Sequence, residues 1–145
     1  MSLRVIVCGG RRFGELTEHL PLCDQETDRV RAYREVAALY QALNTLQDRH
    51  GIETIIDGGC LTGADRHARA WAARREIDNI NYPADWRQDG KKAGPMRNTR
   101  MVADSEADVV VATPGGKGTA DCVRKAARAG LIVITVNVAA QGVLA

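Results

Sequence analysis

The sequence predicts one α/β domain with a Rossmann-like three-layer sandwich, in which helices cover both faces of a mostly parallel sheet of about five strands. Short β-branched segments alternate with helical segments along the chain of 145 residues, and this alternation is typical of parallel strand pairing. Aromatic residues account for only 4% of the chain, whereas Ala, Val, Ile and Leu are plentiful, as expected for helices packed on a parallel sheet. The length is that of a single domain, residues 1–145.

The first strand, residues 4–8, is a β-branched segment that ends at Gly9–Gly10. Residues 11–26 are long for a connection between a strand and a helix and contain Pro21, so they predict an irregular insertion or a lid. A helix follows and ends at Gly51. Its predicted apolar face recurs at steps of three and four residues and consists of Val30, Tyr33, Val36, Ala37, Tyr40, Leu43 and Leu46.

The rest of the chain repeats the alternation of strand and helix. The predicted elements are a strand over 53–57, a helix over 64–76, a strand over 79–82, a polar loop over 84–95, a helix over 96–105, a strand over 108–112, a helix over 119–129 and a strand over 131–136. In the second of these helices, Ala68, Trp71 and Ala72 are expected to face inward. The tail over 138–145 is either disordered or part of an oligomer contact.

Charge and cysteine content limit the classes of partner. The formal net charge of +2 is too small to indicate a polyanionic partner by itself. The four cysteines include no CxxC pair and follow no secretory leader, so we expect free thiols in the cytoplasm. The histidines lack the short spacings of metal ligands. We therefore expect a cytoplasmic protein with no metal, no cofactor and no membrane partner.

Paired glycines end three of the predicted strands and indicate a phosphate-binding edge. Glycine lets an anion approach the backbone N–H groups, and a following helix adds unpaired donors and a partial positive charge. The strongest instance is residues 114–119, which open a helix after an apolar strand. There Thr119 either caps the helix or binds a phosphate oxygen. The alternative is a tight turn without a ligand, and neither G-x-G-x-x-G nor the Walker pattern is present.

Four other residues lie in or near these loops and bear on the predicted site. Asp65 either binds a ribose hydroxyl or fixes its loop. Arg97 offers a planar fork for a phosphate or carboxylate. Trp86 either forms a stacking surface for a base or packs its own loop. Cys60 is not expected to act as a nucleophile, because no histidine follows at a useful spacing.

Together, several segments resemble the SLOG superfamily and specifically its YspA-like, cpYpsA-related branch. The matching segments are residues 7–11, 57–59, 62–65, 83–86, 90–98 and 114–121. The resemblance implies a Rossmannoid fold and a nucleotide or nucleotide-derived ligand. The complete set of candidate ligand-binding residues is Gly9, Gly10, Arg11, Gly58, Gly59, Asp65, Trp86, Arg97, Asn98, Gly115, Gly116, Gly118 and Thr119.

More distantly, the chain resembles phosphoribohydrolases of the Lonely Guy type. Those enzymes carry P-G-G-x-G-T-x-x-E, and the glutamate assists departure of the base from the ribose. The position of that glutamate is Cys122 in this chain, and Asp121 stands one residue earlier. An enzyme arginine that precedes a lysine matches Arg97, which precedes Asn98 here. Phosphate binding therefore carries over from the resemblance, whereas glycosidic cleavage does not.

Three functions of different classes follow. The leading hypothesis is a module that senses or sequesters a nucleotide-like small molecule. The alternative is hydrolysis of a nucleoside 5′-monophosphate to base and ribose 5-phosphate, with Asp121 and Arg97 as candidate catalytic residues and Asp65 or Asp57 as substitutes for the acid. A nucleic-acid-binding role, by analogy with DNA-processing relatives, conflicts with the near-neutral charge. A homo-oligomer could form through a second face of the long helix.

Overall fold

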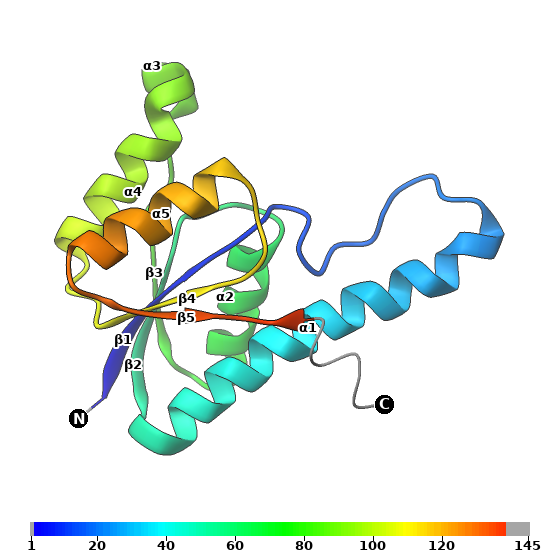
Figure 1. The fold of residues 1–145 in the computed structure, drawn as a ribbon, viewed down its shortest axis with the longest axis horizontal. Coiled ribbons are helices and arrows are strands. Elements are labelled where there is room, and N and C mark those ends of the chain that lie inside the picture. Colours follow the sequence, from blue (N-terminus) through cyan, green and yellow to red (C-terminus); the bar gives the residue numbers. More distant parts are fainter. Residues whose placement is uncertain (1, 139–145) are drawn as a thin grey trace.

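The computed structural model describes residues 2–138. Within that range, five strands form one sheet in the order β3-β2-β1-β4-β5, and all neighbouring strands are parallel. The elements are β1 (Leu3–Cys8), α1 (Leu22–His50), β2 (Ile52–Asp57), α2 (Ala64–Arg74), β3 (Asp78–Asn81), α3 (Trp86–Asp89), η1 (Gly90–Lys92), α4 (Ala93–Asp104), β4 (Val109–Ala112), α5 (Lys117–Arg128) and β5 (Ile132–Thr135). Helices lie on both sides of the sheet (Figure 1), which confirms the predicted Rossmann-like fold.

The central strands are continuous apolar segments because helices cover both of their faces. Val5, Ile6 and Val7 of β1 are completely buried. Successive side chains of a strand point to opposite faces, so Val7 packs in the core beneath α1 and α2, whereas Cys8 packs in the core beneath α4 and α5. Trp71 of α2 is completely buried in the first of these cores, as predicted.

The register brings the loops after the strands to one edge of the sheet. Cys8, the last residue of β1, pairs with Ala112, the last residue of β4. Asp57, the last residue of β2, pairs with Asn81, the last residue of β3. Because all the strands are parallel, the three glycine-containing loops leave the sheet at the same edge, as the sequence predicts.

Helix α1 begins earlier than the sequence predicts. It starts at Leu22, so residues 22–26, predicted as part of an irregular insertion, are helical. Pro21 directly precedes the first helical residue. A proline there breaks no helical hydrogen bond, so it starts the helix instead of interrupting it.

The remaining connection, residues 11–21, is anchored to the body of the domain. Phe13 is buried in the core with 4% of its surface exposed. The N–H of Gly14 donates to Glu35 Oε1 at 2.8 Å, and Glu15 Oε2 accepts the N–H of Gly63 at 2.9 Å. These contacts attach the segment to α1 and to the start of α2. Opening of this segment as a lid stays a prediction.

The apolar face predicted for α1 is wrong in its N-terminal half. Val30 and Tyr33 are exposed, with 42% and 75% of their surface accessible, and Ala37 is exposed as well. Leu39, absent from the predicted face, is completely buried, as is Leu43. The N-terminal part of α1 projects beyond the sheet (Figure 1), so its apolar side chains have no strand beneath them. An oligomer contact through this second face stays a prediction.

The segment predicted as a polar loop over 84–95 is mostly helical. It contains α3, the 3-10 turn η1 and the first turn of α4. Asp85 caps α3 by accepting the N–H of Gln88 at 3.1 Å. Pro95 lies in the first turn of α4, where its missing N–H costs no helical hydrogen bond. The glycines and the proline of this segment therefore lie at the ends of short helices and do not form a continuous loop.

The tail predicted over 138–145 lies outside the described residues, except for Val138. None of the helices within residues 2–138 combines the length and the apolar composition that a membrane span requires.

Candidate functional site

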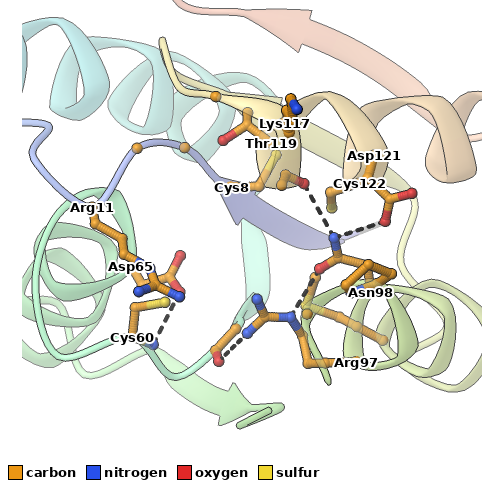
Figure 2. A pocket seen from close by; sticks show the side chains of 18 of the residues that line it. Cys8, Arg11, Cys60, Asp65, Arg97, Asn98, Lys117, Thr119, Asp121 and Cys122 are labelled. Atoms are coloured by element: carbon orange, nitrogen blue, oxygen red, sulfur yellow. Dashed lines mark hydrogen bonds between the residues drawn. The ribbon is translucent and has the colours of Figure 1, made fainter. Parts of the chain in front are cut away.

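A cavity of about 670 Å³ opens at the edge of the sheet where the loops meet (Figure 2). It is lined by the loop after β1, the loop after β2, the starts of α2, α4 and α5, and α3. Most of the predicted site residues line it: Gly9, Gly10, Arg11, Gly58, Asp65, Trp86, Arg97, Asn98, Gly116, Gly118, Thr119 and Asp121. Gly59 and Gly115 are not among the lining residues.

The glycines after β1 hold the loops together. A Cβ added at Gly9 would lie 1.7 Å from Thr113 Oγ1 and 2.8 Å from Ala64 Cβ, so only glycine fits there. The N–H of Gly10 donates to the carbonyl of Pro114 at 2.9 Å, and the carbonyl of Gly10 accepts the N–H of Ala64 at 3.1 Å. These glycines therefore allow the close approach of three loops that forms the cavity.

The start of α5 offers open backbone donors to the cavity. The helix begins at Lys117, with Gly116 at the N-cap and no side chain capping it. Thr119 is thus the third helical residue, so of the two roles predicted for it helix capping is wrong, and phosphate binding stays a prediction. A Cβ added at Gly116 or Gly118 would meet nothing within 4 Å. The first N–H groups of a helix have no acceptor within it, so this turn can bind an anion.

Arg97 forms part of the opposite wall and is held by the backbone. Its Nη1 donates to the carbonyl of Gly58 and, at 3.4 Å, to the carbonyl of Tyr82. Its Nε donates to Asn98 Oδ1 at 2.8 Å. Within residues 2–138, Nη2 has no hydrogen-bond partner. The guanidinium is therefore fixed at the cavity with one nitrogen available for a ligand.

Asn98 is buried and joins two helices. Its Nδ2 donates to the carbonyl of Gly118 and to Asp121 Oδ2, both at 3.1 Å. Its Oδ1 accepts from Arg97. The side-chain donors and acceptor are thus used by the protein, and the residue positions α4 against α5 beside the cavity (Figure 2).

Asp121 is an ion-paired carboxylate. Lys125 Nζ and Arg124 Nη2 each lie 2.8 Å from its oxygens. Burial opposes its charge, but hydrogen bonds from Lys125 and Asn98 and the two neighbouring cations outweigh burial and hold the pKa of Asp121 below its ordinary value. Cys122, at the position of the Lonely Guy glutamate, is buried with 1% exposed.

Asp65 has a different environment. Only 7% of its surface is exposed, and its Oδ2 accepts the N–H of Cys60 at 3.1 Å. Burial, together with the charge of Asp57, raises the pKa of Asp65 above its ordinary value. Within residues 2–138, no cation forms an ion pair with Asp65.

The cavity concentrates positive charge. Four of its cations form no ion pair with a carboxylate of the described chain: Arg11, Lys91, Arg97 and Lys117. The guanidinium of Arg11 lies 5.3 Å from the ring centre of Trp86, which is 48% exposed. The sequence did not single out Lys91 and Lys117, although both lie in segments that carry the family resemblance. Among the described residues, no three His, Cys, Asp or Glu side chains are grouped to hold a metal ion.

Comparisons with known proteins identify a family and a relative. A profile described as YAcAr, the YspA, cpYpsA-related SLOG family, matches residues 3–88. The chain is 37% identical over 111 residues to the gene 61 protein of Mycobacterium phage D29, and the alignment covers 72% of this chain and 88% of the phage protein. The profile match includes the loops after β1 and β2 and Trp86, and ends before α4.

Proposed function

The chain belongs to the YspA, cpYpsA-related SLOG family, and we propose that it binds a nucleotide or nucleotide-derived small molecule, which it senses or sequesters. One observation carries the proposal. Several cations line a single cavity without a carboxylate to pair with among the described residues, and the open first turn of α5 faces the same cavity. Such a cleft attracts anions, and a phosphate satisfies both the cations and the free N–H groups.

The proposed ligand lies with its phosphate at the first turn of α5, near Lys117 and Thr119. Arg97 contributes its free nitrogen from the opposite wall. The base stacks beside the exposed ring of Trp86 and the guanidinium of Arg11, which lies over that ring. Stacking on a ring and a guanidinium is favourable for any flat base, so this end of the site recognises a nucleobase without choosing among bases.

Binding without cleavage has better support than hydrolysis. In the proposed hydrolysis a carboxylate stabilises positive charge developing on the ribose. Asp121 is instead neutralised by Arg124 and Lys125. Cys122 occupies the position of the glutamate of the Lonely Guy enzymes. The chain therefore has a glycine-containing turn like that of the phosphoribohydrolases at residues 114–119, but no unpaired carboxylate at the position of their catalytic glutamate.

Isothermal titration with nucleoside monophosphates, ADP-ribose and cyclic nucleotides tests the proposal. We expect binding that weakens with salt and that loses about fivefold in affinity, the equivalent of roughly 1 kcal/mol, in Lys91→Gln. Lys92→Gln is the matched control, because Lys92 is an exposed lysine next to Lys91 that does not line the cavity. Chromatography of the same mixtures should detect no released base. Absence of heat and of thermal shift for every ligand overturns the proposal, and catalytic base release overturns its non-enzymatic part.

A further inference from the structure

Asp65 is the one carboxylate of the cavity lining that forms no ion pair within the described residues. The other acid of the lining, Asp121, is paired with two cations. Asp65 is more deeply buried than Asp121. The charge of Arg97 favours its ionised form, but without a direct ion pair the burial of a carboxylate remains costly for a fold. A residue kept at that cost beside a cavity is a candidate for ligand recognition.

The hydrogen bonds of Asp65 are incomplete. A carboxylate can accept about four hydrogen bonds. Within residues 2–138, its donors all belong to Cys60, whose N–H reaches Oδ2 at 3.1 Å and whose thiol also contacts the carboxylate. Asp65 is also part of the cavity lining. Figure 2 shows Asp65 and Cys60 across the opening from Asn98 and Asp121.

The position of Asp65 determines which part of a ligand it can meet. A phosphate at Asp65 would be repelled by its charge, whereas the open N–H groups at the start of α5 lie in another part of the lining. Gly58 and Arg97 both lie beside the carboxylate, since a Cβ added at Gly58 would be 3.1 Å from Asp65 Oδ2 and would overlap Arg97 Nη1. The complementary group is a neutral donor, and a hydroxyl is the neutral donor that the sugar of a nucleotide supplies.

We propose that Asp65 accepts hydrogen bonds from the vicinal hydroxyl groups of a ribose and thereby makes the site selective for ribonucleotide-type ligands over their 2′-deoxy counterparts. This inference rests on the proposed function. It makes Asp65 a specificity-determining residue, in addition to its contact with the loop at Cys60. A role limited to fixing that loop would leave the preference between the two sugars unchanged.

Titration of matched pairs tests the inference: ribose 5-phosphate with 2-deoxyribose 5-phosphate, AMP with 2′-deoxy-AMP, and GMP with 2′-deoxy-GMP. A hydrogen bond to a charged group predicts roughly a 10- to 100-fold preference for the ribose form. Asp65→Ala should abolish that preference while phosphate binding persists. Asp104→Asn, an exposed acid outside the cavity, should keep it.

The outcomes separate the inference from the proposed function. Equal affinity of the wild-type chain for both sugars, or an unchanged preference in Asp65→Ala, overturns the role of Asp65 while phosphate binding stands. No binding of any of these compounds overturns the proposed function and the inference together. If Asp65→Ala does not fold, Asp65→Asn decides the matter, because the amide oxygen still accepts from Cys60 while the negative charge is gone. Its preference should fall severalfold, and an undiminished preference overturns the inference.

Discussion

The side chain of Asn98 donates a hydrogen bond to Asp121 Oδ2 at 3.1 Å and so joins α4 to α5 beside the cavity. The same amide nitrogen donates to the carbonyl of Gly118, at the open turn of α5. The position of that turn therefore depends on one buried amide. Arg97, which donates to the oxygen of this amide, depends on it as well.

Replacing Asn98 with alanine should destabilise the fold by about 1–3 kcal/mol, because the hydrogen bonds that this buried amide donates to Asp121 and to the carbonyl of Gly118 are lost. Phosphate affinity should fall too, because the α5 turn and Arg97 lose a common support. Thr99→Ala, at the exposed neighbouring position, should change stability by no more than about 0.5 kcal/mol. Urea unfolding monitored by circular dichroism measures both. Equal stability of the two variants would contradict this account of Asn98.

Two glycine substitutions should separate the structural glycines from the ligand-facing ones. Gly9→Ala forces a Cβ into Thr113 and Ala64 and should cost about 1–3 kcal/mol of stability. Gly118→Ala meets nothing within 4 Å and lies in a helix, so it should be neutral or stabilising by up to about 1 kcal/mol. It should nevertheless weaken phosphate binding, since its methyl group extends from the cavity lining. Thermal unfolding and titration with AMP test this pair. Unchanged AMP affinity in Gly118→Ala would contradict the assignment of Gly118 to the ligand-facing glycines.

Trp86→Ala should weaken nucleotide binding without affecting the phosphate end of the site. Base stacking is worth about 1–3 kcal/mol, which is a loss of roughly 5- to 150-fold in AMP affinity. Ribose 5-phosphate, which has no base, should bind the variant and the wild-type chain equally. Met96→Ala is a suitable control because this exposed apolar residue does not line the cavity. An equal loss for both ligands would mean that Trp86 supports the loop and does not contact a base.

Asp121→Asn should lower stability at neutral pH by about 1 kcal/mol or less, because 55% of the Arg124 side chain is exposed and its ion pair is screened. The pKa of Asp121 is lowered in the folded chain. Its stabilising contribution is therefore fully present above its unfolded pKa of about 4 and is lost as the pH falls through its folded value. Unfolding midpoints at pH 7 and pH 3 should show the difference between variant and wild type shrinking in acid. A constant difference would exclude the ionised carboxylate as its source.

Asp65→Asn should have the opposite effect. The pKa of Asp65 is raised by burial and by Asp57, so its contribution to stability is present below its unfolded pKa and is lost as the pH rises through its folded value. The variant should therefore unfold at a higher temperature than the wild-type chain at pH 8, by about 2–4 °C if the change is roughly 1 kcal/mol. The advantage should disappear near pH 4. A lower midpoint at pH 8 would mean that the charge of Asp65 stabilises the fold.

Sequence signals of short range predicted the fold well. The β-branched segments and the glycines that end them specify strands and turns through contacts between chain neighbours, so five parallel strands and their common edge could be predicted. The same signals failed where the outcome depended on distant partners. Val30 and Tyr33 belong to an apolar periodicity, yet they are exposed, because no strand lies beneath that part of α1.

For the candidate site, the sequence by itself determined which residue types gather at the edge of the sheet: glycines, cations, two acids and Trp86. Only the tertiary structure decided what each is free to do. Asp121 is next to the expected catalytic position in sequence, but cations on its own helix neutralise it, whereas Asp65 lines the cavity without an ion pair among the described residues. The physical reason is that the free energy of a charged group depends on its burial and on its nearest partners in space, and these are contributed by elements far apart in the chain.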